Sequence, residues 1–318
     1  MRRMLLFLVL FAGCHALAQD CTQIMPAIMV DEESRTFLSG ITPDRLHAKL
    51  GRVIVPVASV ERISGFRLLI LFDISGSMEQ KDSLFSHQHK ALALVSRTLD
   101  ELLDELPQGT KVEYGLFNNN AAFGPAFTAN SEELRKSLSD LREQMKRRGR
   151  KATALYDALR ESLARFDSPQ PGDSVLLVTD GMDNESRLRA GKVEEEAARK
   201  GVRVFTILLN EGHFDYDGSR LVMLDFAERT GGSVHVINVA GNAWTGAKEP
   251  EEERRELRRF WNNEVLAGYV LRFNLPANAK KQGKWMLSVD RLPGQKTKIL
   301  AAYPSRLNAC PVATAAAH

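Results

Sequence analysis

Two apolar runs, each ending at an aspartate, constrain the fold of this chain more than any other feature. The first covers residues 67–72 and is followed by Asp73; the second covers residues 174–178 and is followed, after one threonine, by Asp180. Continuously apolar runs of this length are typical of strands buried on both faces of a parallel sheet. Apolar residues at helical spacing, as in 83–105, lie between such runs. The sequence therefore predicts an α/β fold: a doubly wound, mostly parallel sheet with small flanking N- and C-terminal β segments.

Oxygen-bearing side chains follow these runs. Asp73, Ser75 and Ser77 alternate along the chain, so an extended segment points them the same way. Thr153 opens a predicted helix, and Asp180 follows the second run. In open α/β sheets, ligands bind outside the carboxyl ends of strands, where the strand order reverses. We therefore expect these five side chains to meet at that edge.

The predicted ligand set contains carboxylate and hydroxyl oxygens only. Such ligands suit Mg²⁺ or Mn²⁺, whereas zinc and copper favour His and Cys. Two serines, a threonine and one or two aspartates do not fill a shell of about six oxygens. The metal would keep water and accept an outside carboxylate. A strand-end aspartate with serines is also a common turn or helix cap, and the presence of all three segments favours the metal site over that alternative.

The same segments resemble the von Willebrand factor type A (VWA) domain. The run from Asp73 to Ser77 matches its DxSxS signature, Thr153 matches its metal-site threonine, and Asp180 matches its distal aspartate. The resemblance implies a metal-ion-dependent adhesion site (MIDAS). Ser75, Ser77 and Thr153 would be direct or water-linked ligands, with Asp73 and Asp180 close behind.

The overall layout is also similar to a secreted VWA-related family first described from acidobacteria. Its members carry a short N-terminal β segment, then the VWA domain, then a C-terminal stretch with tyrosine-containing strands. Residues 268–269, 283–285 and 302–304 echo that stretch. The chain departs from many relatives at Lys151-Ala152, where they carry two glycines, so this loop is expected to be stiffer and more positive. The resemblance implies architecture more than function.

Composition shifts and strand patterns divide the chain into four parts. We predict a signal peptide over 1–18, a small N-terminal β module over 19–64, a VWA domain over 65–240, and a charged helix plus a C-terminal β lobe over 241–318. The charged helix, which begins near residue 250, interleaves opposite charges and is expected to be solvated and self-paired.

The first residues are typical of a secretory signal. Arg2 and Arg3 precede an apolar run over 4–13, and residues 16–18 form a small-x-small cleavage site. The run is too short to span a bilayer, and no later segment is long and apolar enough, so no membrane span is expected after signal removal. A secreted or periplasmic location follows. Lipoprotein processing at Cys14 is the alternative.

Signal removal also changes the charge and the cysteine count. Loss of Arg2 and Arg3 lowers the formal net charge from +3 to +1, so the basic composition gives no argument for nucleic-acid binding. Cys21 and Cys310 remain, one near each end. An even pair in an exported protein suggests a disulfide that ties the termini together, with two unpaired thiols as the alternative.

A basic run leads into Thr153. Its cations are Arg147, Arg148, Arg150 and Lys151. They could form a basic rim that draws an acidic partner towards the metal. The same residues also suit the C-terminal end of a helix, where cations complement the dipole and a glycine stops the helix.

The sequence predicts a secreted, adhesion-type binding module rather than an enzyme. A divalent cation at the MIDAS would complete its shell with an exposed Asp or Glu of a protein partner. The first alternative is a structural envelope or assembly component with a structural or non-functional metal site. A phosphatase-like hydrolase is less favoured, because Ser75 stands where such an enzyme needs a second aspartate. No catalytic residue is assigned, and Ser75 lacks the Gly-x-Ser-x-Gly elbow of serine hydrolases.

Overall fold

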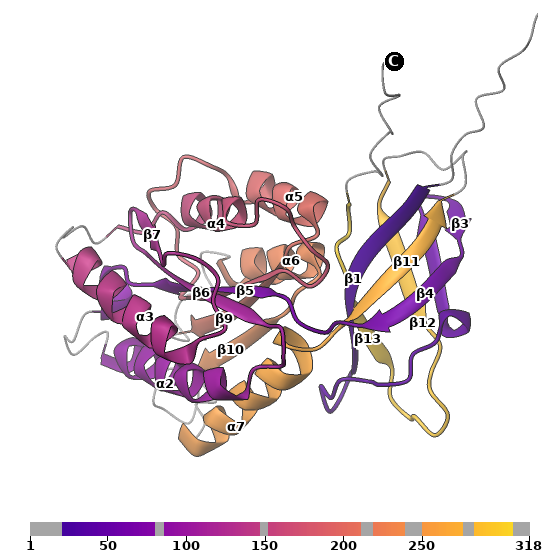
Figure 1. Ribbon diagram of the computed structural model, residues 1–318, viewed down its shortest axis with the longest axis horizontal. Helices are drawn as coiled ribbons and strands as arrows, with labels where there is room; N and C mark the ends of the chain where they lie inside the picture. Colours follow the sequence, from indigo (N-terminus) through magenta and orange to yellow (C-terminus); the bar gives the residue numbers. More distant parts are fainter. Residues whose placement is uncertain are drawn as a thin grey trace, which may run out of the picture.

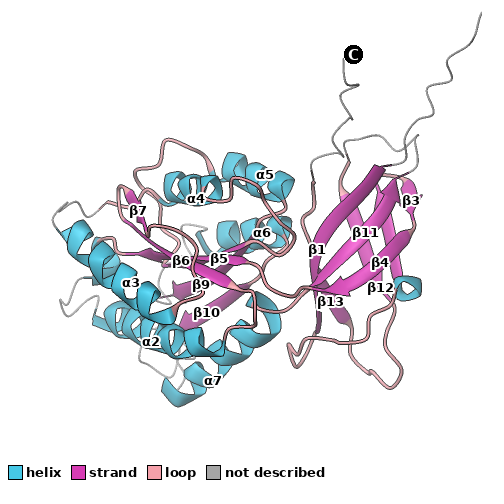
Figure 2. Cartoon of the chain, in the orientation of Figure 1, coloured by secondary structure: helices cyan, strands magenta, loops and turns pink. Residues whose placement is uncertain are grey.

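The protein is described by a computed structural model over residues 21–79, 86–146, 152–210, 219–238, 250–275 and 283–307. The ribbon separates into an α/β domain and a smaller β domain that lie side by side (Figures 1 and 2). The chain begins its described part in the β domain, passes through the α/β domain, and returns to the β domain. Each domain has its own apolar core.

A six-stranded sheet forms the centre of the α/β domain. Its order is β10-β9-β8-β5-β6-β7; β7 is antiparallel to β6, and the other neighbours are parallel. The strands are β5 (Arg67–Asp73), β6 (Lys111–Phe117), β7 (Ala121–Phe123), β8 (Ser174–Thr179), β9 (Arg203–Asn210) and β10 (Val234–Asn238). The predicted doubly wound, mostly parallel fold is confirmed.

Helices cover both faces of this sheet, as Figure 1 shows. One face carries α2 (Ser86–Leu102), α3 (Ser131–Lys146) and α7 (Pro250–Phe260); the other carries α4 (Leu155–Ala164), α5 (Ala190–Lys200) and α6 (Ser219–Thr230). Successive side chains of β5 alternate between the two cores: Leu68 and Ile70 join the first, and Leu69 and Leu71 join the second. This double burial explains why residues 68–72 of the strand are all apolar.

Two small antiparallel sheets pack face to face in the β domain. The four-stranded sheet has the order β13 (Ile299–Ala302), β1 (Cys21–Asp31), β11 (Tyr269–Leu275), β4 (Val57–Arg62); the three-stranded sheet has the order β12 (Trp285–Val289), β2 (Leu46–Leu50), β3 (Val53–Val55). Met25, Phe273 and Trp285 are buried between them. The remaining short elements are η1 (Pro43–Arg45), α1 (Gly76–Glu79), η2 (Leu103–Glu105) and the π-helical turn η3 (Trp261–Val265).

The N- and C-terminal β segments make one domain, whereas the sequence suggested two separate modules. β1 pairs with β11 from Cys21↔Leu275 to Ala27↔Tyr269, and β2 pairs with β12 from Leu46↔Val289 to Leu50↔Trp285. Neither segment has enough strands to bury an apolar face alone. Pairing across more than two hundred residues of sequence supplies the missing strands.

The charged helix also differs from expectation. α7 buries Leu257 and Phe260 in the core of the α/β domain, so it belongs to that domain. Its arginines pair mainly with α2 and η2: Arg258 Nη1 lies 2.5 Å from Glu105 Oε1, and Arg254 lies 3.9 Å from Glu101. One ion pair within the helix, Arg254 with Glu251 at 3.8 Å, matches the predicted self-pairing.

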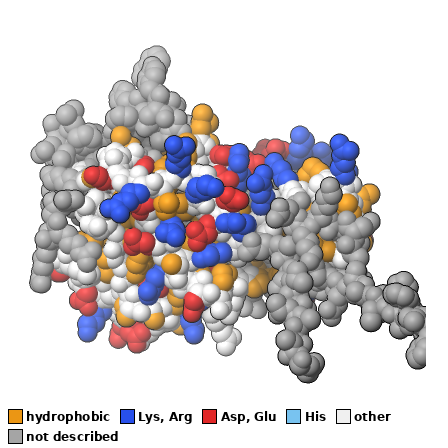
Figure 3. Space-filling model, turned by 90° about the horizontal axis from the view of Figure 1, so that it is seen from above, with side chains coloured by type: hydrophobic (Ala, Val, Ile, Leu, Met, Phe, Trp, Pro, Cys, Tyr) orange, Lys and Arg blue, Asp and Glu red, His pale blue; other side chains and the backbone are white. Residues whose placement is uncertain are grey.

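Mixed charge covers the surface seen in Figure 3, which looks down on the molecule from above the view of Figure 1. Lys and Arg side chains alternate there with Asp and Glu over the α/β domain. A surface that intersperses both signs produces no strong field of one sign. Within the described residues, no helix is long and apolar enough to cross a membrane.

Several sequence predictions concern residues outside the described part of the chain. They are the signal peptide over 1–18 with Cys14, the disulfide partner Cys310, and the basic rim of Arg147, Arg148, Arg150 and Lys151. Cys21 begins β1, but its proposed pairing with Cys310 stays a prediction.

β1 and a partly buried ion pair connect the two domains. Ile28 and Val30 of β1 join the core of the α/β domain, whereas Ala27 and Met29 join that of the β domain. Close by, Arg35 reaches from the turn after β1 to Glu264 in η3. Its Nε and Nη2 lie 3.1 and 2.5 Å from the two carboxylate oxygens, in the bidentate geometry that makes such pairs strong.

Removing one partner of this pair should destabilise the protein. The Glu264 carboxylate is nearly buried, so Arg35→Ala leaves it without a cation and should lower the free energy of unfolding by about 2 kcal/mol. Adding Glu264→Gln should recover part of that loss. Urea unfolding of wild type, both single variants and the double variant gives the coupling. Effects that add to within about 0.5 kcal/mol would show that the pair contributes nothing.

Candidate functional site

The strand order reverses at β5, and both predicted carboxylates lie there. The chain leaves β5 for β6 on one side and later returns to β8 on the other. Asp73 is the last residue of β5, and Asp180 directly follows β8. Because β5 and β8 are parallel neighbours, their carboxyl ends meet at one edge of the sheet. This is the position at which open α/β sheets bind ligands.

Hydrogen bonds join the first and last predicted segments. Asp73 is fully buried; its Oδ1 accepts the N–H of Ser75 at 2.8 Å, and its Oδ2 accepts the hydroxyl of Thr179 at 2.8 Å. Thr179 Oγ1 in turn accepts the N–H of Gly181 at 3.0 Å. Residues after β5 and at the end of β8 therefore both hold the carboxylate of Asp73. Thr179 orients this carboxylate, a role that the sequence did not predict.

The two carboxylates at this edge disfavour each other's charge. Burial raises the pKa of the Asp73 carboxyl well above its usual range, and the negative charge of Asp180 raises that pKa further. Hydrogen bonds from Ser75 and Thr179 act in the opposite direction and are outweighed. A positive charge close to both groups would relieve this repulsion.

Thr153 is brought to the same region by the loop after β8. Its N–H donates to Asn184 Oδ1 at 2.9 Å, and its carbonyl accepts the N–H groups of Asn184 and Glu185 at 3.0 and 3.1 Å. The threonine is almost fully buried just before α4, so it lies at a helix N-terminus as predicted. Bonds on both sides of its peptide fix where its hydroxyl can lie.

The same loop caps the start of α4. Asp183 Oδ1 accepts the N–H of Leu155 at 2.9 Å and the hydroxyl of Ser186 at 2.6 Å. Ser186 Oγ accepts the N–H of Tyr156 at 3.0 Å. From the sequence, Asp183 and Asn184 were expected to shape the rim near Asp180 and were assigned no ligand role. Local sequence gave no signal for this cap, because α4 precedes Asp183 and Ser186 in the chain by about 30 residues.

A third loop, after β6, completes the connection. The N–H of Ile74 donates to Phe117 O at 2.8 Å, and the N–H of Ala154 donates to Asn118 O at 2.7 Å. The DxSxS segment and the Thr153 segment are thus bonded to neighbouring residues of one loop. The structure brings all three predicted segments to one place. Ser75 is buried there, and Ser77 lies in α1, where its side chain is not among those described.

The donor set fits a hard cation. Asp73, Asp180, Ser75 and Thr153 offer carboxylate and hydroxyl oxygens, which suit Mg²⁺ or Mn²⁺. Across the described parts of the chain, there is no cluster of three or more His, Cys, Asp and Glu side chains that could hold a metal ion. The candidate site itself has two carboxylates and hydroxyl groups, and these four residues include no His or Cys, the ligands that zinc and copper prefer.

A family model for the von Willebrand factor type A domain matches residues 68–241. The chain belongs to this family. The matched VWA residues run from β5 through β10 and include every segment of the candidate site. Among curated proteins, no match is found.

Several solved structures resemble the chain at low identity. The conserved hypothetical protein BatB from Bacteroides thetaiotaomicron is 20% identical with a TM-score of 0.43, covering 62% of this chain and 100% of its own. The von Willebrand factor type A structure from Catenulispora acidiphila is 14% identical with a TM-score of 0.46, covering 86% of this chain and 76% of its own. The ArnB paralog VWA2 from Sulfolobus acidocaldarius is also 14% identical, with a TM-score of 0.42 and coverages of 91% and 76%.

The repulsion between the two carboxylates predicts an unusual stability effect. In chelator, Asp73→Asn should raise the free energy of unfolding by about 1 kcal/mol, or about 2–4 °C in Tm, because it removes one of two buried like charges. Its amide retains an oxygen that can accept the Ser75 N–H. Thermal unfolding measures the change, with the exposed Asp140→Asn as control. A clear loss of stability would show that the hydrogen bonds of the Asp73 carboxylate outweigh the repulsion.

Proposed function

We propose that this protein is a secreted, metal-dependent protein-binding module of the adhesion type. The observation that carries the proposal is the buried pair of Asp73 and Asp180 at the switch point of the sheet, with Ser75 and Thr153 beside them. Two buried carboxylates without a cation are unfavourable, so this arrangement favours a site that takes one. VWA domains mediate protein interactions, which agrees with a binding role.

The residues proposed to hold Mg²⁺ or Mn²⁺ are Asp73, Ser75, Ser77, Thr153 and Asp180. When bound, the divalent cation supplies positive charge and a coordination position for an Asp or Glu of the partner. Ser75 N–H and the Thr179 hydroxyl orient the Asp73 carboxylate before binding. The loop at 183–186 holds the backbone at Thr153 in place, so the proposed ligands are already close together before the metal binds.

We propose a binding role rather than an enzymatic one. Ser75 is buried and bonded to Asp73 through its N–H, at the position where a phosphatase of related fold needs a general acid. A hydroxyl cannot serve as that acid in the way a second carboxyl group would. Export is proposed from the signal-like residues 1–18. Membership of the secreted VWA-related family is proposed from residues 268–269, 283–285 and 302–304, which resemble its C-terminal stretch.

Metal binding should stabilise the mature protein. For residues 19–318, Mg²⁺ or Mn²⁺ at about a hundred times its Kd should add roughly 2.7 kcal/mol of unfolding free energy relative to chelator. That corresponds to about 5–10 °C in a domain of this size. Thr153→Ala and Asp73→Asn should remove the shift, because each removes a proposed ligand oxygen. Equal Tm values with metal and chelator in the wild type would overturn the metal proposal.

A capture experiment tests the partner. Secreted and envelope proteins are passed over the immobilised protein in Mg²⁺ and eluted with chelator. A specific partner should elute, and it should no longer bind after its carboxylates are amidated. If the thermal shift is present but no partner elutes, the metal is structural and the alternative of an assembly component is favoured.

Asn184 should affect metal affinity without contacting the metal. Asn184→Ala removes the acceptor of the Thr153 N–H, and outer partners of this kind typically change affinity by about 10–100-fold. The neighbouring exposed Glu185→Ala keeps the backbone bond to Thr153 and is the matched control. Calorimetric titration with Mn²⁺ gives both values. Identical affinities for the two variants would show that Asn184 does not position the threonine.

A further inference from the structure

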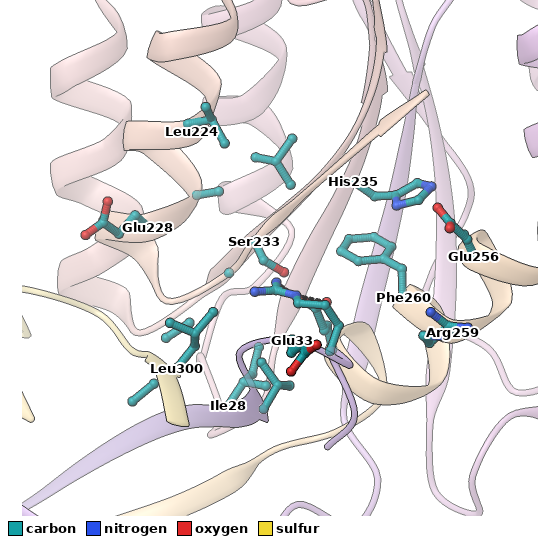
Figure 4. A pocket seen from close by; sticks show the side chains of 18 residues that line it. Ile28, Glu33, Leu224, Glu228, Ser233, His235, Glu256, Arg259, Phe260 and Leu300 are labelled. Carbon is teal, nitrogen blue, oxygen red and sulfur yellow. Dashed lines mark hydrogen bonds and ion pairs between the residues drawn. The ribbon is translucent and has the colours of Figure 1, made fainter. Parts of the chain in front are cut away.

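A cleft of about 790 Å³ opens between the two domains. Its lining comes from α6, β10 and α7 of the α/β domain, and from β1 and β13 of the β domain. Figure 4 shows Leu224 and Glu228 on one side, Phe260 and Arg259 on the other, and Ser233 between them. Pockets at domain interfaces with volumes of about 300–1,000 Å³ are common ligand sites.

The cleft is separate from the candidate metal site. It is lined by residues 233–235 at the amino end of β10. The metal segments lie at the opposite, carboxyl end of the parallel strands, beyond Asp73 and Thr179. Binding in the cleft therefore does not require metal.

Exposed apolar side chains flank the cleft. Leu224 is 39% exposed and Leu300 is 37% exposed, although Ile28 and Val30 beneath them are buried. Leu221, one turn before Leu224 on α6, is 71% exposed and extends the apolar strip beyond the cleft. Exposed apolar surface that continues into a hollow is typical of an interaction site.

β10 presents an unpaired strand edge along this cleft. It is the terminal strand of its sheet, and no other strand of the described chain pairs with its outer side. Val234 is in register with Thr206, and the N–H of Thr206 donates to Ser233 O. In a parallel ladder this places the N–H and C=O of Val234 on the outer side, away from β9. An exposed edge of this kind can template an added strand.

An unpaired hydroxyl lies at the start of the same edge. Ser233 Oγ is buried and has no hydrogen-bond partner among the described residues. A buried polar group without a partner costs about 1–3 kcal/mol, so a ligand that bonds to it gains affinity. Figure 4 places this side chain in the middle of the cleft.

Acidic side chains outnumber basic ones around the cleft. The lining contains Glu33, Glu228, Glu256 and Glu264 against Arg35 and Arg259. Arg35 already forms an ion pair with Glu264. In the described part of the chain, neither Glu33 nor Glu228 has an ion-pair partner. Positive charge on a bound segment would complement this rim.

We propose that the cleft binds an extended segment of a partner protein, apolar in its middle and basic at its ends, which adds as a strand to β10. The outward N–H and C=O groups of Val234 pair with its backbone. Its apolar side chains lie against Leu224 and Leu300, and its cations face Glu33 and Glu228. A second copy of this chain is a poorer occupant, because it would bring the same acidic rim against an acidic rim.

The test uses three fluorescein-labelled peptides with the full mature protein. The first alternates valine and threonine over six residues between terminal lysines; the second replaces the lysines with glutamates; the third places proline in the middle. Fluorescence polarisation in chelator should show saturable binding of the first peptide and at least tenfold weaker binding of the other two. The use of chelator separates this outcome from any failure of the metal proposal.

Two variants and one control locate the site. Val234→Pro removes an N–H that no strand of the described chain uses, and proline is tolerated at sheet edges. Leu224→Glu replaces an apolar side chain of the cleft wall by a charged one, at a position on α6 that is already partly exposed. Each should weaken binding of the first peptide at least tenfold. Ile54→Glu, at a 72% exposed apolar position on β3 away from the cleft, should leave binding unchanged. Leu224→Glu also keeps the test valid if Val234→Pro does not fold.

The outcomes that overturn the proposal are distinct. Absence of saturable binding up to about 1 mM peptide, or equal binding of all three peptides, would exclude strand addition of a basic-flanked segment. Equal losses in Leu224→Glu and Ile54→Glu would place binding elsewhere. A dimer in sedimentation equilibrium that Leu224→Glu dissociates would show that a second copy occupies the cleft instead.

Discussion

Burial of β5 on both faces determines the arrangement of the α/β domain around it. Its side chains alternate between two apolar cores, so the strand can only be stable between β6 and β8 with helices on both faces. That position makes its carboxyl end the point where the strand order reverses. Asp73 is therefore buried at a switch point, beside the end of β8. Burial next to Asp180 makes its charge unfavourable, and the proposed cation would relieve this cost.

The loop that follows β8 supports the residues of the proposed site. Asn184 bonds to the backbone of Thr153 on both sides, and Asp183 with Ser186 caps the helix that the threonine precedes. These side chains are not proposed ligands, yet they determine where a ligand oxygen lies. Rigid support of this kind lowers the entropy that binding has to overcome. The same fold leaves β10 at the far edge of the sheet, where the junction with the β domain forms a second and chemically different hollow.

Local patterns predicted the α/β domain well because its signals are local. A run that is apolar throughout identifies a doubly buried strand, and helical periodicity identifies the covering helices. The predictions that were wrong concern helix caps and ion pairs, which depend on contacts with other parts of the structure. The cap of α3 is one example: Asn130, and not the serine that begins the helix, accepts the N–H groups of Glu132 and Glu133 at 3.0 and 3.3 Å. α7 was expected to pair its own charges, but most of its pairs reach α2 and η2, since packing of Leu257 and Phe260 brings its arginines there.

Consecutive residues are enough to predict the doubly wound sheet, the identities of the proposed ligands and their order along the chain, because buried strands and the oxygens that follow them are local features of the sequence. The single β domain built from N- and C-terminal segments becomes visible only in the fold, since the sequences of β1 and β11 contain no signal that they pair. The tertiary structure also decided that Asn184 supports Thr153 and that a cleft lies beside β10. Those features arise from contacts between distant segments, and such contacts exist only after the cores have packed.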